Sequence, residues 1–377
     1  MSEIRQVLAA VSELAGRNEP MALATIAATR GSTYRRAGAR LLIPSHGEPI
    51  GNLSGGCLED EVARVGQEVM STGTPRLLTF DMTAEGEEVW GYGLGCNGAI
   101  DVFVEPASMA VETAAAFGEA IEAARPVALV TVIESSSQEH ATPGARFLLG
   151  ADGSEHGGIS SALDEAARQA ALNALTDGQS LLVELPLPDG GSATTFVEVA
   201  RPPLRLVICG AGHDAIPLVR QASAMGWRII VADIRRAFLN HRRFPEAAGF
   251  VDVNPLAAAE AIGPDARTAV ILMSHNYLRD SEYLRSFAQG GIARLAYLGI
   301  LGPRGRSARL LAELEAEGIM LADADRSRLH APAGLDLGAE EPEEVAASLV
   351  AEILSVERAH SGRPLRETAG PIHGTVR

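Results

Sequence analysis

Leu204-Arg205-Leu206-Val207-Ile208-Cys209-Gly210-Ala211-Gly212 is the stretch that decides the fold in the second half of this 377-residue chain. Its apolar residues predict a buried strand, and its glycines predict a tight turn into a helix that ends near Met225. A second apolar strand over 227–232 then ends at Asp233, at a distance from the glycines typical of parallel βαβ units. Strand, glycine turn, helix, strand and acid in this order predict a Rossmann-type unit.

The glycine turn carries residue types that suit a dinucleotide. Gly210 and Gly212 would let the backbone approach a pyrophosphate, whose charge the N-terminus of the following helix would stabilise. Asp233 would accept hydrogen bonds from a ribose diol, and Arg235 and Arg236 behind it leave both NAD and NADP open. The alternative is a Rossmann-type domain that binds no dinucleotide.

Two histidines belong to the same predicted edge of the sheet. His213 and Asp214 fill the variable positions of the glycine turn, as a proton donor with its orienting partner or, for Asp214, as a favourable first-turn residue only. His275 follows a predicted strand over 270–273 and would face the same crevice as Gly210. Each histidine is either an acid–base group or a structural residue.

The first half of the chain contains a degenerate duplication. Ala22-Leu23-Ala24-Thr25 returns as Ala128-Leu129-Val130-Thr131, and at the same shift Gly38-Ala39-Arg40 falls on Gly144-Ala145-Arg146. A shared register over several motifs favours a repeated unit over chance. We therefore predict an α/β protein with the following parts: an N-terminal α/β domain over 1–200 with two copies at about 1–106 and 107–200, a Rossmann-like doubly wound parallel sheet over 204–360, and a loose tail over 361–377.

Two of the three cysteines stand among glycines. Cys57 follows Gly55 and Gly56 and precedes a predicted helix, whose free N–H groups and dipole would favour a thiolate or an anion. Cys96 lies in Gly93-Leu94-Gly95-Cys96-Asn97-Gly98. The second copy has Ser161-Ala162 in place of Gly55-Gly56-Cys57, so the scaffold is repeated without the thiol. This difference favours chemistry at Cys57, with a soft ligand or a metal, over simple packing.

Two other kinds of thiol site are weaker alternatives. A zinc site would need further cysteine or histidine partners at metal-ligand spacing, and the sequence around Cys57 and Cys96 has none. The sequence also leaves a nucleophilic cysteine paired with a histidine as an alternative, although it has no motif that would place such a cysteine at a sharp turn between a strand and a helix.

Four arginines surround the turn Gly31-Ser32-Thr33-Tyr34: Arg30, Arg35, Arg36 and Arg40. Four guanidinium groups so close together repel one another unless an anion or carboxylates lie nearby. Because guanidinium groups suit phosphate, the cluster predicts an anion site. The alternative is a solvated hairpin paired with the acidic run Glu59-Asp60-Glu61.

Composition excludes several classes of partner. The formal net charge is −16 and the pI is about 5.1, so we expect no nucleic-acid or membrane binding through overall charge. Three cysteines do not form a disulfide framework, the N-terminus has no basic and apolar leader, and no apolar run is long enough for a membrane span. We expect a reduced, soluble, cytoplasmic protein.

Taken together, the motifs resemble the XdhC/CoxI family, accessory factors for xanthine dehydrogenase and related molybdenum hydroxylases. The resemblance runs from about residue 20 to 355. It rests on the following blocks: Gly31-Ser32-Thr33-Tyr34-Arg35-Arg36, Ser54-Gly55-Gly56-Cys57-Leu58-Glu59, Gly93-Leu94-Gly95-Cys96-Asn97-Gly98, Cys209-Gly210-Ala211-Gly212-His213-Asp214-Ala215, Leu272-Met273-Ser274-His275-Asn276, Leu298-Gly299-Ile300-Leu301-Gly302-Pro303-Arg304 and His330-Ala331-Pro332-Ala333-Gly334-Leu335-Asp336-Leu337-Gly338.

The resemblance implies a chaperone without turnover of its own. Such proteins bind the molybdenum cofactor (molybdopterin), favour its sulfurated form and hand it to an apo molybdenum hydroxylase, with a cysteine desulfurase as sulfur donor. Cys57 and Cys96 then become contacts of the molybdenum centre, and association with a dimeric client suggests a homodimer. The residues expected to hold the cofactor or a nucleotide such as NAD(P) are Gly55, Gly56, Cys57, Cys96, Arg35, Arg36, Arg40, Gly210, Gly212, His213, Asp233 and His275.

Two alternatives to the chaperone stay open. The first is an NAD(P)-dependent oxidoreductase that uses the Rossmann domain, with His213 or His275 as its acid–base group. The second is a binding protein whose Rossmann unit docks the partner hydroxylase.

Overall fold

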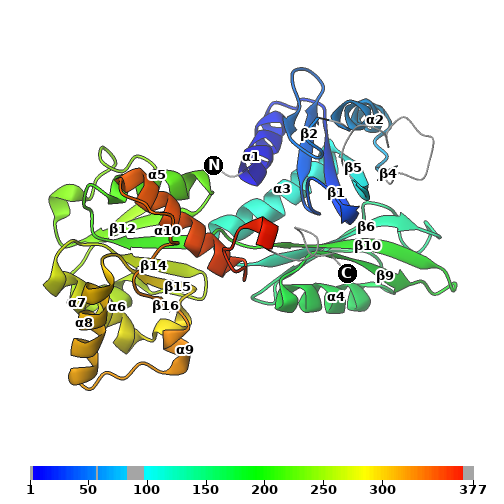
Figure 1. The fold of residues 1–377 in the computed structure, drawn as a ribbon. Helices are drawn as coiled ribbons and strands as arrows, with labels where there is room; N and C mark the ends of the chain where they lie inside the picture. Colours follow the sequence, from blue (N-terminus) through cyan, green and yellow to red (C-terminus); the bar gives the residue numbers. More distant parts are fainter. Residues whose placement is uncertain (1–2, 57, 83–96, 368–377) are drawn as a thin grey trace. The chain divides into compact units, whose positions relative to one another are not determined.

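The structure is a computed structural model that describes residues 3–56, 58–82 and 97–367. Two of the predicted ligands, Cys57 and Cys96, lie outside these residues. The chain divides into two compact units, an N-terminal unit up to Pro202 and a C-terminal unit from Pro203 onward (Figure 1). No helix in the described ranges is both long and apolar enough to cross a lipid bilayer.

The N-terminal unit begins with helix α1 (Glu3–Gly16) and a five-stranded antiparallel sheet. Helix α2 (Glu59–Thr72) covers one face of this sheet, because Val62, Val65 and Val69 recur at helical spacing and pack against its strands. The strands, in the spatial order β3-β2-β1-β5-β4, are β1 (Met21–Ser32), β2 (Arg40–Pro44), β3 (Ile50–Gly51), β4 (Arg76–Asp81) and β5 (Asn97–Pro106).

A second five-stranded sheet repeats the first. Helix α3 (Ala107–Glu122) precedes it and helix α4 (Asp164–Asp177) packs on it. Even the irregularities agree: the pairing register skips Ala27 in β1 and Ile133 in β6. The predicted duplication is thus confirmed at the level of topology. The strands, in the order β8-β7-β6-β10-β9, are β6 (Val127–Ser135), β7 (Arg146–Gly150), β8 (Glu155–Gly158), β9 (Leu181–Pro186) and β10 (Ser192–Ala200).

Reciprocal buried ion pairs join the two copies. Arg40 of the first copy lies 2.5 Å from Glu198 of the second, with side chains 2% and 9% exposed. At the matching position of the second copy, Arg146 pairs with Glu105 of the first. Helices α1 and α3 also share one hydrophobic core, so the copies form a pseudo-symmetric pair rather than two separate domains.

The C-terminal unit is built on a six-stranded sheet whose strands all run parallel. Their order reverses between β11 and β14, which is the switch point where ligands bind in such sheets. This confirms the predicted Rossmann-like fold. The strands, in the order β13-β12-β11-β14-β15-β16, are β11 (Arg205–Cys209), β12 (Arg228–Asp233), β13 (Gly249–Asp252), β14 (Thr268–Leu272), β15 (Tyr297–Ile300) and β16 (Leu329–His330).

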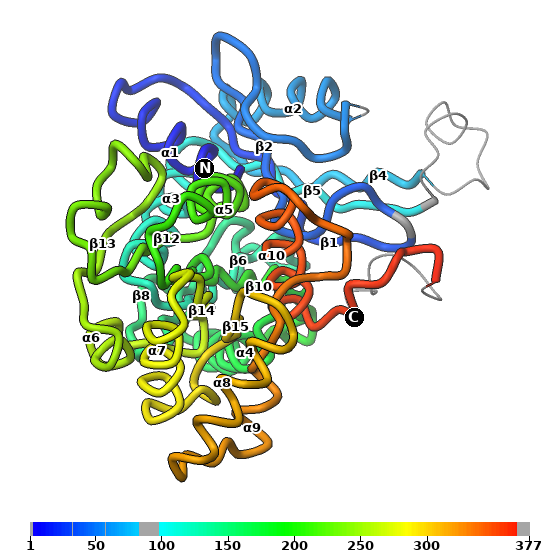
Figure 2. The backbone as a smooth tube through the Cα atoms, turned by 60° about the vertical axis from the view of Figure 1, so that its left-hand side comes forward, coloured from blue at the N-terminus to red at the C-terminus, as the bar shows by residue number. Residues whose placement is uncertain are grey.

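Helices cover both faces of the parallel sheet. On one face α5 (Ala215–Ala224) lies beside α10 (Pro342–Glu357), although the two are far apart in sequence (Figure 2). On the other face α6 (Ala258–Ile262), α7 (Tyr277–Gly290) and α8 (Arg304–Ala316) pack against the strands. The short helix α9 (Asp323–Arg326) follows α8. Burial on both faces explains the continuous apolar strands that the sequence shows.

Candidate functional site

Three motifs of the N-terminal unit converge at the end of β1. In the ladder between β1 and β5, Gly31 pairs with Gly98 and Ser32 with Asn97. Two residues further on, Tyr34 lies against Gly55: its Cε1 atom is 3.5 Å from the position that a Cβ of Gly55 would take. The segments 31–34, 54–56 and 97–98 therefore meet, and we call this region the glycine corner. The sequence neighbours of both Cys57 and Cys96 belong to it.

One carboxylate organises the loop of the glycine corner. Glu59, at the start of α2, accepts five hydrogen bonds from the residues just before or beside it. Burial alone would raise the pKa of Glu59, but the hydrogen bonds from the Ser54 hydroxyl and from backbone N–H groups lower it to about 2. The donors are Leu53 N (3.0 Å), Ser54 N (2.8 Å), Ser54 Oγ (2.6 Å), Gly56 N (3.0 Å) and Leu58 N (3.1 Å).

The backbone of this loop requires glycine. Gly55 and Gly56 have φ of 83° and 112°, in the left-handed region where other residues are strained. In the second copy Asp164 takes the place of Glu59 and accepts hydrogen bonds from Ile159 N (2.7 Å) and Ser160 N (3.2 Å). The acid that ties the loop to the helix is thus common to both copies, while the glycine pair is not.

This arrangement restricts one prediction about the start of α2 at the residues just before the helix. The sequence suggested free N–H groups here for a thiolate or an anion. Instead, the N–H groups of Gly56 and Leu58 donate to Glu59, and that of Gly55 donates to Asn52 Oδ1 at 2.9 Å. These three donors are unavailable to an external anion.

Replacing the organising carboxylate should loosen the loop. We expect Glu59→Gln to lower stability by about 1–2 kcal/mol at pH 7, the size of a lost helix cap. The pKa of Glu59 is depressed in the folded protein, so the stability that its carboxylate contributes is fully present above the ordinary pKa of a glutamate. This stability is lost as the pH falls towards 2, and Glu59→Gln should not show this loss of stability at low pH. Hydrogen exchange of residues 53–58 between pH 7 and pH 3 measures both effects.

The matched control is Glu61→Gln, since Glu61 pairs only with the exposed Arg64 on the same helix. Its exchange profile over 53–58 should equal that of the wild type. Equal exchange in Glu59→Gln and wild type would contradict the organising role of Glu59.

The arginine cluster is paired with carboxylates, though not with the acidic run of α2. Arg30 contacts Asp101 through both nitrogens at 2.5 and 3.0 Å, and Arg35 contacts Glu3 at 2.9 and 2.7 Å. Arg40 is buried against Glu198, which places it out of reach of an external anion and corrects its prediction as a cofactor contact. Arg35 and the exposed Arg36 stay predicted contacts.

In the C-terminal unit, the glycine turn approaches the end of β14 very closely. A Cβ on Gly210, whose φ is 131°, would lie 2.5 Å from the carbonyl oxygen of Met273 and 2.7 Å from Ser274 Cα. His275 Cδ2 lies 3.4 Å from the Cβ position of Gly212. The structure therefore places His275 beside Gly212, next to the strand end that Gly210 approaches.

The histidine partner of Asp214 differs from the prediction. Asp214 Oδ2 lies 3.0 Å from His275 Nε2, and His213 is exposed beside them. Of the two alternatives for Asp214, the orienting partner of His213 is thus not seen, and Asp214 lies at the start of α5 with its carboxylate directed to His275. A carboxylate at this position opposes the pyrophosphate charge that the glycine turn was expected to hold.

Asp233 is occupied by its own chain. It accepts hydrogen bonds from Ala211 N at 2.7 Å and from three nitrogens of Arg235, at 2.8, 3.0 and 2.7 Å. Burial would raise the pKa of Asp233, but the hydrogen bonds from Arg235 and Ala211 lower it below its usual value. A ribose diol would have to displace Arg235 to reach this carboxylate.

The remaining cysteine is a core residue. Cys209 ends β11 with no exposed surface. Burial, together with the nearby charges of Asp280 and Asp233, raises the pKa of the Cys209 thiol well above its ordinary value. The thiol therefore stays protonated and packs.

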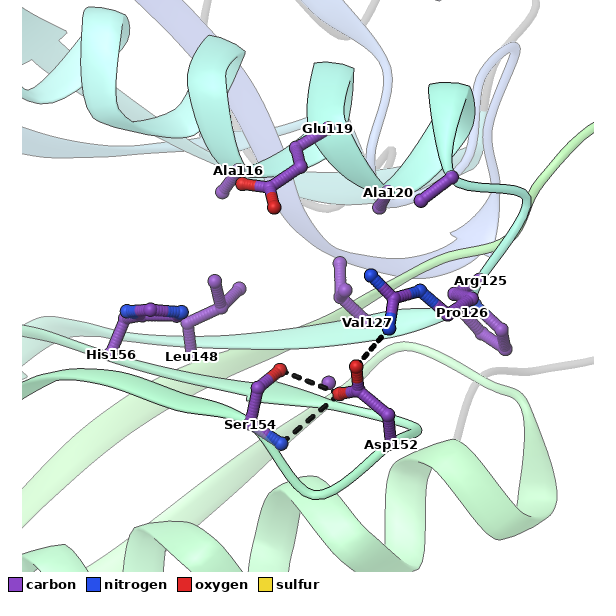
Figure 3. A pocket seen from close by; sticks show the side chains of 12 residues that line it. Ala116, Glu119, Ala120, Arg125, Pro126, Val127, Leu148, Asp152, Ser154 and His156 are labelled. Atoms are coloured by element: carbon purple, nitrogen blue, oxygen red, sulfur yellow. Dashed lines mark hydrogen bonds and ion pairs between the residues drawn. The ribbon is translucent and has the colours of Figure 1, made fainter.

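A shallow pocket in the N-terminal unit lies apart from these motifs. Glu119 of α3 and His156 of β8 line it, and Arg125 contacts Asp152 at its end (Figure 3). None of the predicted site residues lines this pocket. Within the described ranges, no three histidine, cysteine or acidic side chains gather as a metal ion would need.

The fold and the glycine corner define a two-unit α/β protein, with duplicated antiparallel sheets and a Rossmann-type C-terminal unit. Residues 206–353 match the family model of the XdhC Rossmann domain, and residues 14–81 and 120–186 match that of the XdhC and CoxI family. A probable xanthine dehydrogenase subunit from Bacillus subtilis (strain 168) is 31% identical over 347 residues, covering 90% of this chain and 94% of that protein. The chain belongs to the XdhC and CoxI family, which confirms the resemblance seen in its motifs.

Two further relatives and one solved structure are similar. The uncharacterized protein YqeB of Escherichia coli (strain K12) is 31% identical over 65% of this chain and 46% of its own length. The molybdenum cofactor insertion chaperone PaoD of the same strain is 24% identical over 89% of this chain and 82% of its own. A crystal structure of a protein from Bacillus halodurans, described as a xanthine dehydrogenase, has a TM-score of 0.75 and 28% identity and covers 98% of each chain.

Sequence reasoning missed two features of the site. The role of Glu59 was readable in principle, because Leu58-Glu59 matches Leu163-Asp164 at the start of each copy's helix. The contact of Tyr34 with Gly55 had no sequence signal, since no spacing rule brings a turn residue to a loop 21 positions away.

Proposed function

We propose that this protein binds the molybdenum cofactor at the glycine corner and delivers it, in sulfurated form, to an apo molybdenum hydroxylase of the xanthine dehydrogenase type. A cysteine desulfurase supplies the sulfur, and the carrier acts as a homodimer in the cytoplasm without turnover of its own. The single observation that carries the proposal is the convergence of the segments 31–34, 54–56 and 97–98, which flank both glycine-associated cysteines. The printed name of the relative PaoD, a molybdenum cofactor insertion chaperone, supports the choice of cargo.

The residues of the glycine corner have chemistry that suits this cargo. Cys57 and Cys96 supply thiolates, soft ligands for the molybdenum centre or its sulfido group. Apart from its two chain neighbours, no atom of the described residues lies within 4 Å of the position that a Cβ of Gly56 would take, which favours room for a ligand beside the backbone. Arg35 and Arg36, on the same turn as Tyr34, contact the phosphate of the cofactor. The Rossmann crevice, with Gly210, Gly212, His213, Asp233 and His275, takes a nucleotide or the client protein.

The oxidoreductase alternative has weaker support. The oxygens of Asp233 already accept hydrogen bonds from Arg235 and Ala211, and Asp214 places a negative charge beside the glycine turn. Both features oppose a dinucleotide in the arrangement that the structure shows.

The cysteine assignment is tested with purified protein loaded with the cofactor. We expect Cys57→Ala and Cys96→Ala each to reduce the bound molybdenum per protein, and the double variant to lose at least about tenfold in affinity, the effect of about 1.4 kcal/mol. Cys209→Ala is the matched control, because it removes a buried thiol and should retain full binding. Transfer from the loaded wild type to an apo hydroxylase then tests delivery. Full binding by the double variant would refute the cysteine assignment, and a wild type that binds no cofactor would refute the function.

A further inference from the structure

Tyr34 presents an unusual surface at the glycine corner. Its side chain is 64% exposed, and it is the only aromatic residue among the exposed large hydrophobic side chains of the described ranges. One side of its ring rests on Gly55, with Cε1, Cδ1 and Cζ between 3.5 and 3.7 Å from the Cβ position of that glycine. A ring this exposed leaves apolar surface in water in a chain with only 4% aromatic residues.

The pairing of ring and glycine occurs in only one of the two copies. At the shift that aligns the copies, Tyr34 corresponds to His140 and Gly55 to Ser161. His140 is turned towards Asp189, with Nε2 at 3.9 Å from its carboxylate. The exposed ring and the glycine therefore accompany Cys57, and both are replaced in the copy that lacks the cysteine.

The charges of the loop restrict what it can recognise. The N–H groups of Ser54, Gly56 and Leu58 donate to Glu59, and the following Asp60 and Glu61 add negative charge. A phosphate would gain little binding energy beside these acidic side chains and occupied N–H groups. A flat, polar ring system needs only an aromatic face to stack on and space beside it. Among the described residues there is space beside Gly56, where a Cβ would meet no atom within 4 Å other than those of its chain neighbours.

We propose that Tyr34 is the stacking platform for the pterin ring system of the cargo. Gly55 supports one side of the ring, the pterin lies against the side that Gly55 does not cover, with room beside Gly56, and the phosphate end points away from the acidic start of α2. This inference rests on the proposed function and specifies which part of the cofactor the glycine corner holds.

The test compares three substitutions at Tyr34 in the full chain. We expect Tyr34→Phe to bind molybdopterin within about twofold of the wild type, because the π face remains. Tyr34→Leu and Tyr34→Ala should bind between about fivefold and about 150-fold more weakly, the range of a lost ring-on-base stack. Quenching of the fluorescence of free oxidised pterin is the second readout, which Tyr34→Leu should abolish and Tyr34→Phe should keep.

His140→Ala is the matched control at the equivalent position of the second copy, and it should leave both readouts unchanged. Thermal denaturation checks that the exposed substitutions leave the fold intact. If the wild type binds molybdopterin and Tyr34→Leu binds it equally well, the stacking inference is overturned while the proposed function stands. A pull-down of the apo hydroxylase provides a further outcome. If Tyr34→Leu no longer retains the hydroxylase but still quenches the pterin fluorescence, the stacking inference is overturned and Tyr34 is instead a contact for the client protein. Absence of binding by the wild type itself would reject the proposed function.

Discussion

Glu198→Ala is expected to lower the free energy of unfolding of the N-terminal unit by about 3–5 kcal/mol, the usual cost of breaking a buried ion pair. The substitution leaves the guanidinium group of Arg40 buried, with its side chain only 2% exposed. Its remaining close contacts are the carbonyl oxygen of Gly38, at 3.1 Å, and the ring of Phe117, whose centroid is 5.0 Å away; Glu105 also attracts it but is paired with Arg146. Neither neighbour replaces the carboxylate.

The reciprocal geometry predicts a matching effect on the other side. Glu105→Ala should cost at most as much as Glu198→Ala, since it leaves Arg146 buried with the exposed Glu112, at 3.5 Å, as its remaining ionic partner. Burial raises the pKa of Glu105, while Arg146, Arg40 and the hydroxyl of Thr113 act in the opposite direction. Chemical denaturation followed by circular dichroism measures both variants.

A surface pair provides the control. Glu13→Ala removes an ion pair with Arg17 in which the side chains are 62% and 60% exposed, and it should change stability by at most about 0.5 kcal/mol. The double substitution Arg40→Met with Glu198→Leu should recover most of the lost stability, because it leaves no buried charge unpaired. A Glu198→Ala protein as stable as Glu13→Ala would show that the buried pair does not hold the copies together.

Gly210→Ala is expected to destabilise the C-terminal unit by about 3–5 kcal/mol, the sum of backbone strain and overpacking. Its φ of 131° is accessible to glycine only, and a Cβ would overlap the carbonyl oxygen of Met273 at 2.5 Å. The neighbours are backbone atoms of the adjacent strand end, which cannot move without disturbing the sheet. Thermal and chemical denaturation should both show the loss.

Gly212→Ala separates packing from ligand binding in the same turn. The nearest atom to its Cβ position is His275 Cδ2 at 3.4 Å, an ordinary contact, so stability should change by less than about 1 kcal/mol. Any loss of nucleotide or client binding in this variant then reports on the crevice itself. If Gly210→Ala proves as stable as Gly212→Ala, the close approach of the turn to β14 is not required for folding.

Local patterns were sufficient to predict most elements. The predicted helix from residue 58 to 70 is α2, and the glycine turn after residue 209 leads into α5, because apolar spacing and glycine positions are properties of short segments. Strands β13 and β16 were among those missed, since four and two residues carry too little periodicity to be seen, and the longer β9 and β10 were not predicted either. The shared register of the two copies also predicted that two sheets would repeat, which the common strand order confirms.

Side-chain partners were predicted less well. The arginines were predicted to bind an anion, with the acidic run at residues 59–61 as the alternative partner, yet Arg30, Arg35 and Arg40 pair with Asp101, Glu3 and Glu198. Likewise Asp214 pairs with His275 and not with its neighbour His213. In each case the partner comes from a different strand or helix, and proximity in sequence was a poor guide to proximity in space.

By itself, the sequence determined most helices and the longer apolar strands of the Rossmann-like part, the duplication, the two glycine turns and the family, because these depend on residue type and spacing along the chain. Only the tertiary structure decided that Glu59 holds the loop before α2, that Tyr34 rests on Gly55 and that Arg40 is buried against Glu198. The physical reason is that a hydrogen bond or an ion pair depends on a few ångströms between atoms. Strand pairing and helix packing set those distances for residues as far apart as Arg40 and Glu198.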